Sequence, residues 1–183
     1  MRELALNILD IVENSVSANS SMIEIDISIV DNLLTISIID NGIGMSEEMA
    51  KTVTDPFVTS RTTRKVGMGI PLFKMASENS GGKFSISSTK NVGTKVTATF
   101  IVDNIDRPPL GDIASTFSGL IYMNSNIRYI FKYNNNGKSF IIDTKEIEDN
   151  LDGIPINEYE VIKFIENMIK ENIQESGGIL WRL

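Results

Sequence analysis

The sequence predicts an α+β protein: a two-layer α/β sandwich with a mixed sheet and helices on one face, plus a small α+β extension. Two periodicities lead to this fold class. Residues 3–18 place apolar side chains at steps of three and four, the spacing of one face of a helix. Residues 22–30 and 33–39 alternate apolar and polar side chains, as half-buried strands do, and the break at 31–32 predicts a hairpin.

The next elements follow from local start and stop signals. Ser46 and the two glutamates after it begin a short helix in the usual capped, acidic manner. Residues 54–67 have no clean period and indicate a long loop, and the glycines at 81–82 end a second helix. We predict that second helix over 68–79, followed by strands over 83–88 and 94–102.

A boundary is predicted at Pro108 and Pro109, because consecutive prolines neither continue a helix nor donate to a sheet. We therefore divide the chain into a first domain over 1–103 and a small α+β extension over 104–183. Residues 157–160 resemble a capping box at the start of the last helix. The extension is predicted to contain, in order, a helix over 112–123, strands over 127–133 and 138–143, and a helix over 158–175.

The composition excludes several kinds of site. A net charge of −7 over 183 residues argues against a general affinity for nucleic acids or anionic lipid, so neither is expected as a partner. The chain has no cysteine and no histidine, which removes disulfides, thiolate or imidazole metal ligands and the commonest general base. No apolar run approaches the ~20 residues of a membrane span, and we expect a cytoplasmic protein.

The first helix carries an unusual polar stripe. At 100° per residue one narrow face collects carboxylates, carboxamides and a hydroxyl, from Glu3, Asn7, Asp10, Asn14 and Ser17. A solvated surface face is the simpler interpretation. However, the stripe lacks lysine and arginine and offers the oxygen ligands that a hard cation such as Mg²⁺ prefers.

Two glycine-rich segments are candidate binding elements. Residues 40–45 (Asp-Asn-Gly-Ile-Gly-Met) follow an apolar strand, and they are either a simple turn or a backbone that turns sharply so that a flat ring can approach. In the second interpretation Asp40 is a buried acceptor for an exocyclic amine. Gly67-Met68-Gly69 begins a helix, whose free N–H groups suit a phosphate. The cations before it indicate either an anion site or a basic surface loop: Arg61, Arg64 and Lys65.

Taken in order, these motifs resemble those of the gyrase, heat-shock chaperone, histidine-kinase and MutL superfamily, which shares the Bergerat nucleotide-binding fold. The resemblance covers about residues 3–102, and its last motif is similar to the end of histidine-kinase catalytic domains. The matching segments are residues 10–15 (N box), 40–45 (G1 box), 55–59 (F box), 67–70 (G2 box), and 81–83 with 93–94.

The resemblance implies that the chain binds ATP with Mg²⁺. It assigns the adenine amino group to Asp40, assisted by Thr94, and the Mg²⁺ to Asn14, while the cations of the lid loop close over the phosphates. Guanine would present a carbonyl to the carboxylate, and such an unpaired buried acceptor costs about 1–3 kcal/mol. The residues implied for the nucleotide are Asn14, Asp40, Gly42, Gly44, Met45, Arg61, Arg64, Lys65, Gly67, Met68, Gly69 and Thr94.

Asp10 departs from the pattern of the superfamily. Members that hydrolyse ATP place a glutamate four residues before the Mg²⁺-binding asparagine as the general base, and histidine kinases commonly place an asparagine there. Aspartate is one methylene shorter than glutamate, and a misplacement of about 1 Å can cost about 10²-fold in rate. Three roles stay open for Asp10: a base for slow hydrolysis, an acceptor for the proton of a protein substrate, or a ligand that orders water around Mg²⁺.

The leading hypothesis is a Mg²⁺-dependent ATP-binding regulatory protein, a histidine-kinase-like ATPase or protein kinase that acts on a separate partner. Since the chain has no histidine, a histidine phosphoacceptor would lie on another polypeptide. An alternative is a non-catalytic, ATP-gated interaction switch, and a dimerising ATPase of the DNA-repair or topoisomerase type is less favoured. A homodimer stays open, with the extension as a candidate docking surface.

Overall fold

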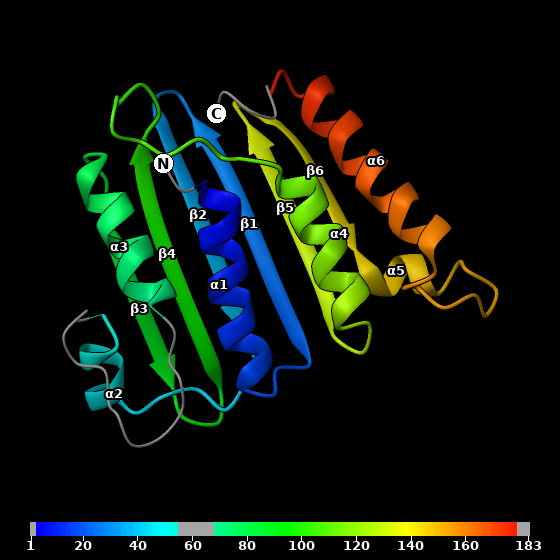
Figure 1. Ribbon diagram of the computed structural model, residues 1–183, viewed down its shortest axis with the longest axis horizontal. Helices are drawn as coiled ribbons and strands as arrows, with labels where there is room; N and C mark the ends of the chain where they lie inside the picture. The colour runs from blue at the N-terminus through cyan, green and yellow to red at the C-terminus, as the bar shows by residue number, and fades with distance from the viewer. Residues whose placement is uncertain (1–2, 55–67, 179–183) are drawn as a thin grey trace.

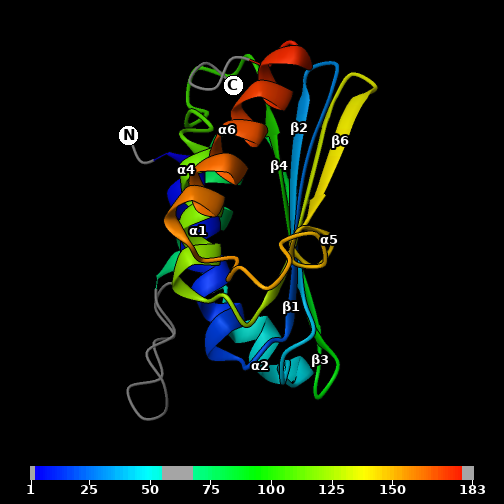
Figure 2. The ribbon, with the colours of Figure 1, turned by 90° about the vertical axis from the view of Figure 1, so that its right-hand side faces the viewer.

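The computed structural model describes residues 3–54 and 68–178. They form two layers, a six-stranded mixed sheet and a set of helices that cover one of its faces (Figures 1 and 2). The predicted fold class is therefore confirmed. Within these described ranges, no helix is both long and apolar enough to cross a membrane.

The elements lie close to their predicted positions. The strands are β1 (Met22–Val30), β2 (Leu33–Asp40), β3 (Phe84–Thr89), β4 (Gly93–Ile101), β5 (Arg128–Asn135) and β6 (Lys138–Asp143). The helices are α1 (Leu4–Ser17), α2 (Glu47–Thr52), α3 (Gly69–Asn79), α4 (Ile113–Met123), α5 (Thr144–Glu148) and α6 (Tyr159–Glu175). The five-residue α5 was not predicted. The predicted capping box is wrong, because α6 has Glu158 as its N-cap and no side-chain cap hydrogen bond.

The β1–β2 hairpin forms the centre of the sheet and of the core. Val30 pairs with Leu33 across the turn, as predicted, and Asp31 takes a positive φ of 52° there. The alternating isoleucines of β1 point their side chains under the helices and are fully buried. Burying one such side chain contributes about 1.5–3 kcal/mol, so the alternation fixes which face of the sheet the helices cover.

The strands after residue 104 continue this same sheet. The strand order is β3-β4-β2-β1-β5-β6, and β5 runs parallel to β1 with Ile25 paired to Phe131. Tyr129 and Phe131 on β5 are fully buried beneath Phe117 of α4. The division at residue 103 stays a prediction, and the hydrogen-bonded sheet runs across it.

The loop before α4 supports the start of α1. The backbone N–H groups of Leu4 and Ala5 donate to the carbonyl oxygens of Pro109 and Leu110 at 2.9 and 2.8 Å. A helix start leaves its first N–H groups without an intrahelical partner, and these bonds satisfy two of them. The proline-containing loop therefore helps to position the helix that carries Asp10 and Asn14.

A pH-dependent contribution to stability is expected at the β6–α5 corner. Arg128 Nε donates to Asp143 Oδ1 at 3.0 Å, and the N–H of Lys145 donates to the same oxygen at 3.0 Å. The Arg128 hydrogen bond lowers the pKa of Asp143 below its ordinary 3.8, although burial opposes the shift. A lowered folded-state pKa stabilises the protein above about pH 4, and this stabilisation is lost as the pH falls through the folded-state value.

Asp143→Asn should therefore reduce the free energy of unfolding in urea at pH 7, and the difference from the wild type should shrink as the pH falls below 4. Asp149→Asn is the matched control, because Asp149 forms an exposed ion pair with Lys145 that contributes little. A difference between Asp143→Asn and the wild type that persists unchanged at low pH would contradict this account.

Candidate functional site

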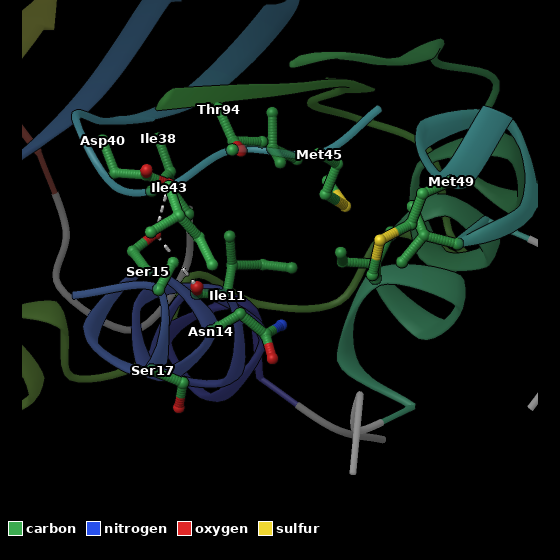
Figure 3. A pocket seen from close by; sticks show the side chains of 15 residues that line it. Ile11, Asn14, Ser15, Ser17, Ile38, Asp40, Ile43, Met45, Met49 and Thr94 are labelled. Atoms are coloured by element: carbon green, nitrogen blue, oxygen red, sulfur yellow. Dashed lines mark hydrogen bonds between the residues drawn. The ribbon is translucent and has the colours of Figure 1, made fainter. Parts of the chain in front are cut away.

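A pocket of ≈ 860 Å³, including its open mouth, lies between α1, the facing ends of β2 and β4, and α2 (Figure 3). Most of its wall is apolar and comes from isoleucine, valine and methionine side chains. A small polar set stands out against this wall: Asn14, Ser15, Ser17, Asp40 and Thr94. An apolar slot with a few directed polar groups is the usual form of a small-molecule site.

Asp40 is the last residue of β2 and only 8% exposed. Its Oδ2 accepts from Ser15 Oγ at 2.7 Å, and its Oδ1 accepts from the N–H of Gly42 at 2.9 Å. Two donors thus fix the plane of the carboxylate. Because an ionised carboxylate has about four acceptor positions, Asp40 keeps acceptor capacity for a donor on a ligand.

Ser15 was not singled out by the sequence analysis. It is 3% exposed and lies on α1 directly after Asn14, where its hydroxyl reaches Asp40 across the pocket floor. Its carbonyl oxygen accepts from Ser20 Oγ at 2.7 Å, which ties the end of α1 to the start of β1. The signal in the sequence was a hydroxyl residue among the apolar positions of the helix.

The glycines of the 40–45 segment face the protein's own backbone. Gly44 has a φ of +60°, and a Cβ there would lie 2.1 Å from the carbonyl oxygen of Thr89. A Cβ on Gly42 would lie 2.6 Å from Ser20 Oγ. Close packing against the residues that follow α1 and against the β3–β4 turn therefore explains both glycines, which accords with the turn interpretation, one of the two that the sequence left open. Gly44 and Met45 do line the pocket.

Asn14 offers an unsatisfied polar atom at the pocket. Its Nδ2 is buried, and no hydrogen-bond partner for it is present in the described part of the chain. Buried polar atoms in proteins nearly always have partners, so an unpaired one beside a pocket points to a ligand. Since a side-chain amide can turn about its last bond, Asn14 can present its oxygen instead.

The other residues of the polar stripe on α1 lie partly at the pocket and partly in the protein interior. Ser17 lines the pocket, whereas Asn7 is 3% exposed and buried, so the stripe is not simply a solvated face. Asp10 lies one turn before Asn14 and is half-buried. A Cβ on Gly69 would lie 2.7 Å from the Cβ of Asp10, so the start of α3 packs directly against this position.

The start of α3 is the described part of the predicted phosphate site. Gly69 is its first residue, Met68 is its N-cap with no side-chain cap hydrogen bond, and Met68 is 61% exposed. Among the described residues, no hydrogen bond from the N-cap side chain satisfies the first N–H groups of α3, and free N–H groups at a helix start suit an anion. The predicted F box at 55–59 lies outside the described residues, as do Arg61, Arg64, Lys65 and Gly67.

Thr94 completes the polar end of the pocket. It is paired with Asp40 across the β2–β4 register. Its Oγ1 lies 2.8 Å from the Oγ of Ser88 on β3, which also accepts from the N–H of Met45 at 2.8 Å. Ser88 is a second residue that the sequence analysis missed, because its role depends on the register of β3 against β4.

These residues fit a nucleotide bound with a metal ion. The apolar slot, closed by a carboxylate and a hydroxyl, suits a purine, and the unpaired amide and the uncapped helix start suit a triphosphate with its cation. No group of three acidic side chains that could hold a metal occurs within the described ranges. A cation here would therefore rely on Asn14 and on oxygens of the ligand.

Comparison with known proteins agrees with this geometry. Residues 2–104 match the family model described as "Histidine kinase-, DNA gyrase B-, and HSP90-like ATPase". A putative sensor protein of Shewanella frigidimarina is 28% identical over 107 residues, 58% of this chain and 16% of that protein. Sporulation kinase D of Bacillus subtilis is 32% identical over 97 residues, 52% of this chain and 19% of that protein. The match thus spans less than a fifth of either relative.

The fold is also that of a solved structure, the N-terminal domain of a DNA repair protein. The two superpose with a TM-score of 0.58 at 16% identity, over 97% of this chain and 57% of that one. The family match covers more than half of the chain and includes the N, G1 and G2 motifs, so the predicted resemblance is confirmed. The chain belongs to the histidine kinase-, DNA gyrase B- and HSP90-like ATPase family, whose fold binds ATP.

Proposed function

We propose that the chain binds ATP together with Mg²⁺ and passes the terminal phosphoryl group to water or to a hydroxyl or imidazole of a partner protein. The observation that supports this best is the convergence of three groups on one side of α1. Among the described residues, the buried Nδ2 of Asn14 has no hydrogen-bond partner, and the N-cap side chain of α3 makes no cap hydrogen bond. Asp10 lies one turn before Asn14, and Gly69 at the start of α3 packs against Asp10. A carboxylate, an amide and helix N–H groups are among the groups that enzymes use for phosphoryl transfer.

Each of the four site residues has a defined task in this proposal. Asp40 and Thr94 hold the purine, while Asn14 orients the metal-bound phosphates. Asp10 accepts a proton from the attacking water or partner group, acting as the general base. ATP would supply the phosphoryl group, and Mg²⁺ would supply the positive charge that offsets the negative oxygens of the triphosphate. A regulatory role on a separate partner is supported by the sensor protein and the sporulation kinase among the relatives.

Asp10→Asn should lower the rate of phosphate release from ATP by about 10²-fold or more, since a general base contributes about 10²–10⁴-fold. The measurement is release of inorganic phosphate by the purified chain, with ATP binding followed in parallel. Asp10→Glu is the matched variant, because it keeps a carboxylate and restores the length found in hydrolysing relatives. Equal release from the wild type and Asp10→Asn, above a protein-free blank, would contradict the assignment of Asp10.

A second candidate is an ATP-gated interaction protein that binds nucleotide without turnover. It is favoured by one observation: among the described residues, Asp10 is not one that lines the pocket. In this case ATP binds, release stays at the blank level for the wild type and for Asp10→Asn, and affinity for a co-purified partner changes with ATP. The same two measurements therefore distinguish the candidates.

A further inference from the structure

We infer that the free edge of β6 pairs with β6 of a second copy of the chain, so that the protein forms a two-fold symmetric dimer through this edge. The inference goes beyond the proposed function and does not depend on it. β6 is the last strand of the sheet, and among the described residues it pairs with β5 alone. Figures 1 and 2 show it at the outer margin of the sheet. Unpaired backbone groups at such an edge are a template for another strand.

The hydrogen bonds of β5 show which backbone groups of β6 face outward. The N–H groups of Arg128, at the start of β5, and of Asn136, just after its end, donate to carbonyl oxygens on the β1 side at 3.0 and 2.8 Å. Backbone groups alternate sides along a strand, so the even-numbered residues of β5 face β1 and the odd-numbered residues face β6. The odd-numbered residues pair with Lys138, Phe140 and Ile142. The N–H and C=O groups of Ser139 and Ile141 therefore point to the free edge.

The side chains along this edge do not block the addition of a strand. Natural edge strands are usually protected by proline, a bulge or charged side chains. Residues 139–142 are Ser-Phe-Ile-Ile, and β6 pairs with β5 without a bulge. Ile141 is 65% exposed on the face of the sheet away from the helices. On the helix side, the ring of Phe140 is partly buried and stacks on Tyr133, with ring centroids 5.4 Å apart. A further strand would cover apolar surface on both faces.

The charges at the two ends of β6 favour a second copy in antiparallel orientation. Lys138 lies at the turn end of the strand, and the other end continues into α5, which carries Glu146 and Glu148. Within the described ranges, none of these three side chains forms an ion pair. An antiparallel partner of the same sequence brings the lysine of each copy toward the acidic α5 of the other. A two-fold axis also closes the assembly at two copies, so no β6 edge stays free.

One register pairs the exposed backbone groups without involving α5. With the two-fold axis at Phe140, Ser139 of each strand lies opposite Ile141 of the other, and the two pairs form four N–H···O=C bonds. The two Phe140 rings meet at the axis, at a non-hydrogen-bonded position where Cα atoms are ~4.5 Å apart. They extend the stack that Tyr133 begins in each copy. The pairing ends before Asp143, whose side chain is buried and caps α5.

Sedimentation velocity of the purified chain without nucleotide tests the assembly. The wild type should show a monomer–dimer equilibrium that shifts to the dimer as the concentration rises. Ile141→Lys places two like charges close to the axis and should weaken dimerisation at least about tenfold. Ile105→Lys is the matched control, because Ile105 is 92% exposed and lies between β4 and α4, outside β6. It should leave the equilibrium unchanged.

Amide hydrogen exchange of the wild type, followed by NMR, identifies the surface and needs no substitution. The N–H groups of Ser139 and Ile141 should exchange more slowly as the concentration rises, because the second copy protects them. The N–H groups of Phe140 and Ile142 face β5 already, so their exchange should stay constant. This alternation along one strand distinguishes pairing through the β6 edge from a dimer formed elsewhere.

A wild type that stays monomeric at its highest soluble concentration would overturn the inference, whether solvent or a different polypeptide covers the edge. So would a dimer whose affinity Ile141→Lys leaves unchanged, once circular dichroism has verified that this variant is folded. If the variant does not fold, the exchange rates of the wild type decide, and rates at Ser139 and Ile141 that do not depend on concentration would contradict the pairing. ATP binding plays no part in either measurement, so failure here leaves the proposed function standing.

Discussion

Asp40→Asn should weaken ATP binding by at least about a hundredfold. The carboxylate of Asp40 already accepts from Ser15 and Gly42, and the adenine amine adds another donor. An asparagine would turn its NH₂ group toward one of these donors and would lose a charge-assisted hydrogen bond. Such a loss is worth about 1.5–3 kcal/mol, and leaving a buried donor unpaired adds about 1–3 kcal/mol, where about 2.8 kcal/mol corresponds to a hundredfold.

Asp26→Asn is the matched control for this substitution. Asp26 lies on the neighbouring strand β1, is not among the described residues that line the pocket, and its pKa is raised by burial. It should therefore leave ATP affinity unchanged, as measured by calorimetric titration with Mg²⁺ present. If Asp40→Asn bound ATP as tightly as Asp26→Asn, the carboxylate would not be the group that holds the purine.

Of the substitutions for which we predict a change in stability, Gly93→Ala should lower the free energy of unfolding the most. Gly93 has a φ of +138°, and a Cβ there would lie 1.9 Å from the carbonyl oxygen of Asp40. A left-handed conformation costs a residue with a side chain about 1–3 kcal/mol, and the backbone collision must in addition separate β4 from β2. We expect the free energy of unfolding in urea to fall by more than about 3 kcal/mol.

Gly153→Ala is the control that separates the cost of the left-handed conformation from the cost of the backbone collision. Gly153 has a φ of +89°, and, apart from its two chain neighbours, no described residue has an atom within 4 Å of the position of its Cβ. Only the conformational cost remains there, so the loss should be about 1 kcal/mol. Equal losses for the two variants would show that the contact between Gly93 and Asp40 leaves room for a Cβ.

Most of the helices and strands could be predicted from the sequence because they have a local signal. The period of α1, the alternation of β1 and β2, and the turn glycines act over a few neighbouring residues. Asp40 was likewise predicted at a strand end facing a ligand. The five-residue α5 has too few residues to show a period, and the start of α6 depends on how the chain leaves the preceding loop.

The partners of Asp40 and Thr94 could not be predicted in the same way. Ser15 reaches Asp40 across 25 positions of the chain, and Ser88 reaches Met45 across 43. These contacts depend on strand register and on where the end of α1 meets the sheet. The pairing of β5, in the extension, with β1 could not be predicted either. A parallel pairing between residues about 106 apart in the sequence leaves no local pattern.

The proposed function depends most on recognition of the adenine amino group by the Asp40 carboxylate. Calorimetric titration of the wild type with ATP and with inosine triphosphate, both with Mg²⁺, tests it directly, because the 6-position carries an amino group in one and a carbonyl in the other. We expect one binding site for ATP and an affinity for inosine triphosphate at least about tenfold weaker. Equal affinities, or no binding of ATP, would contradict it.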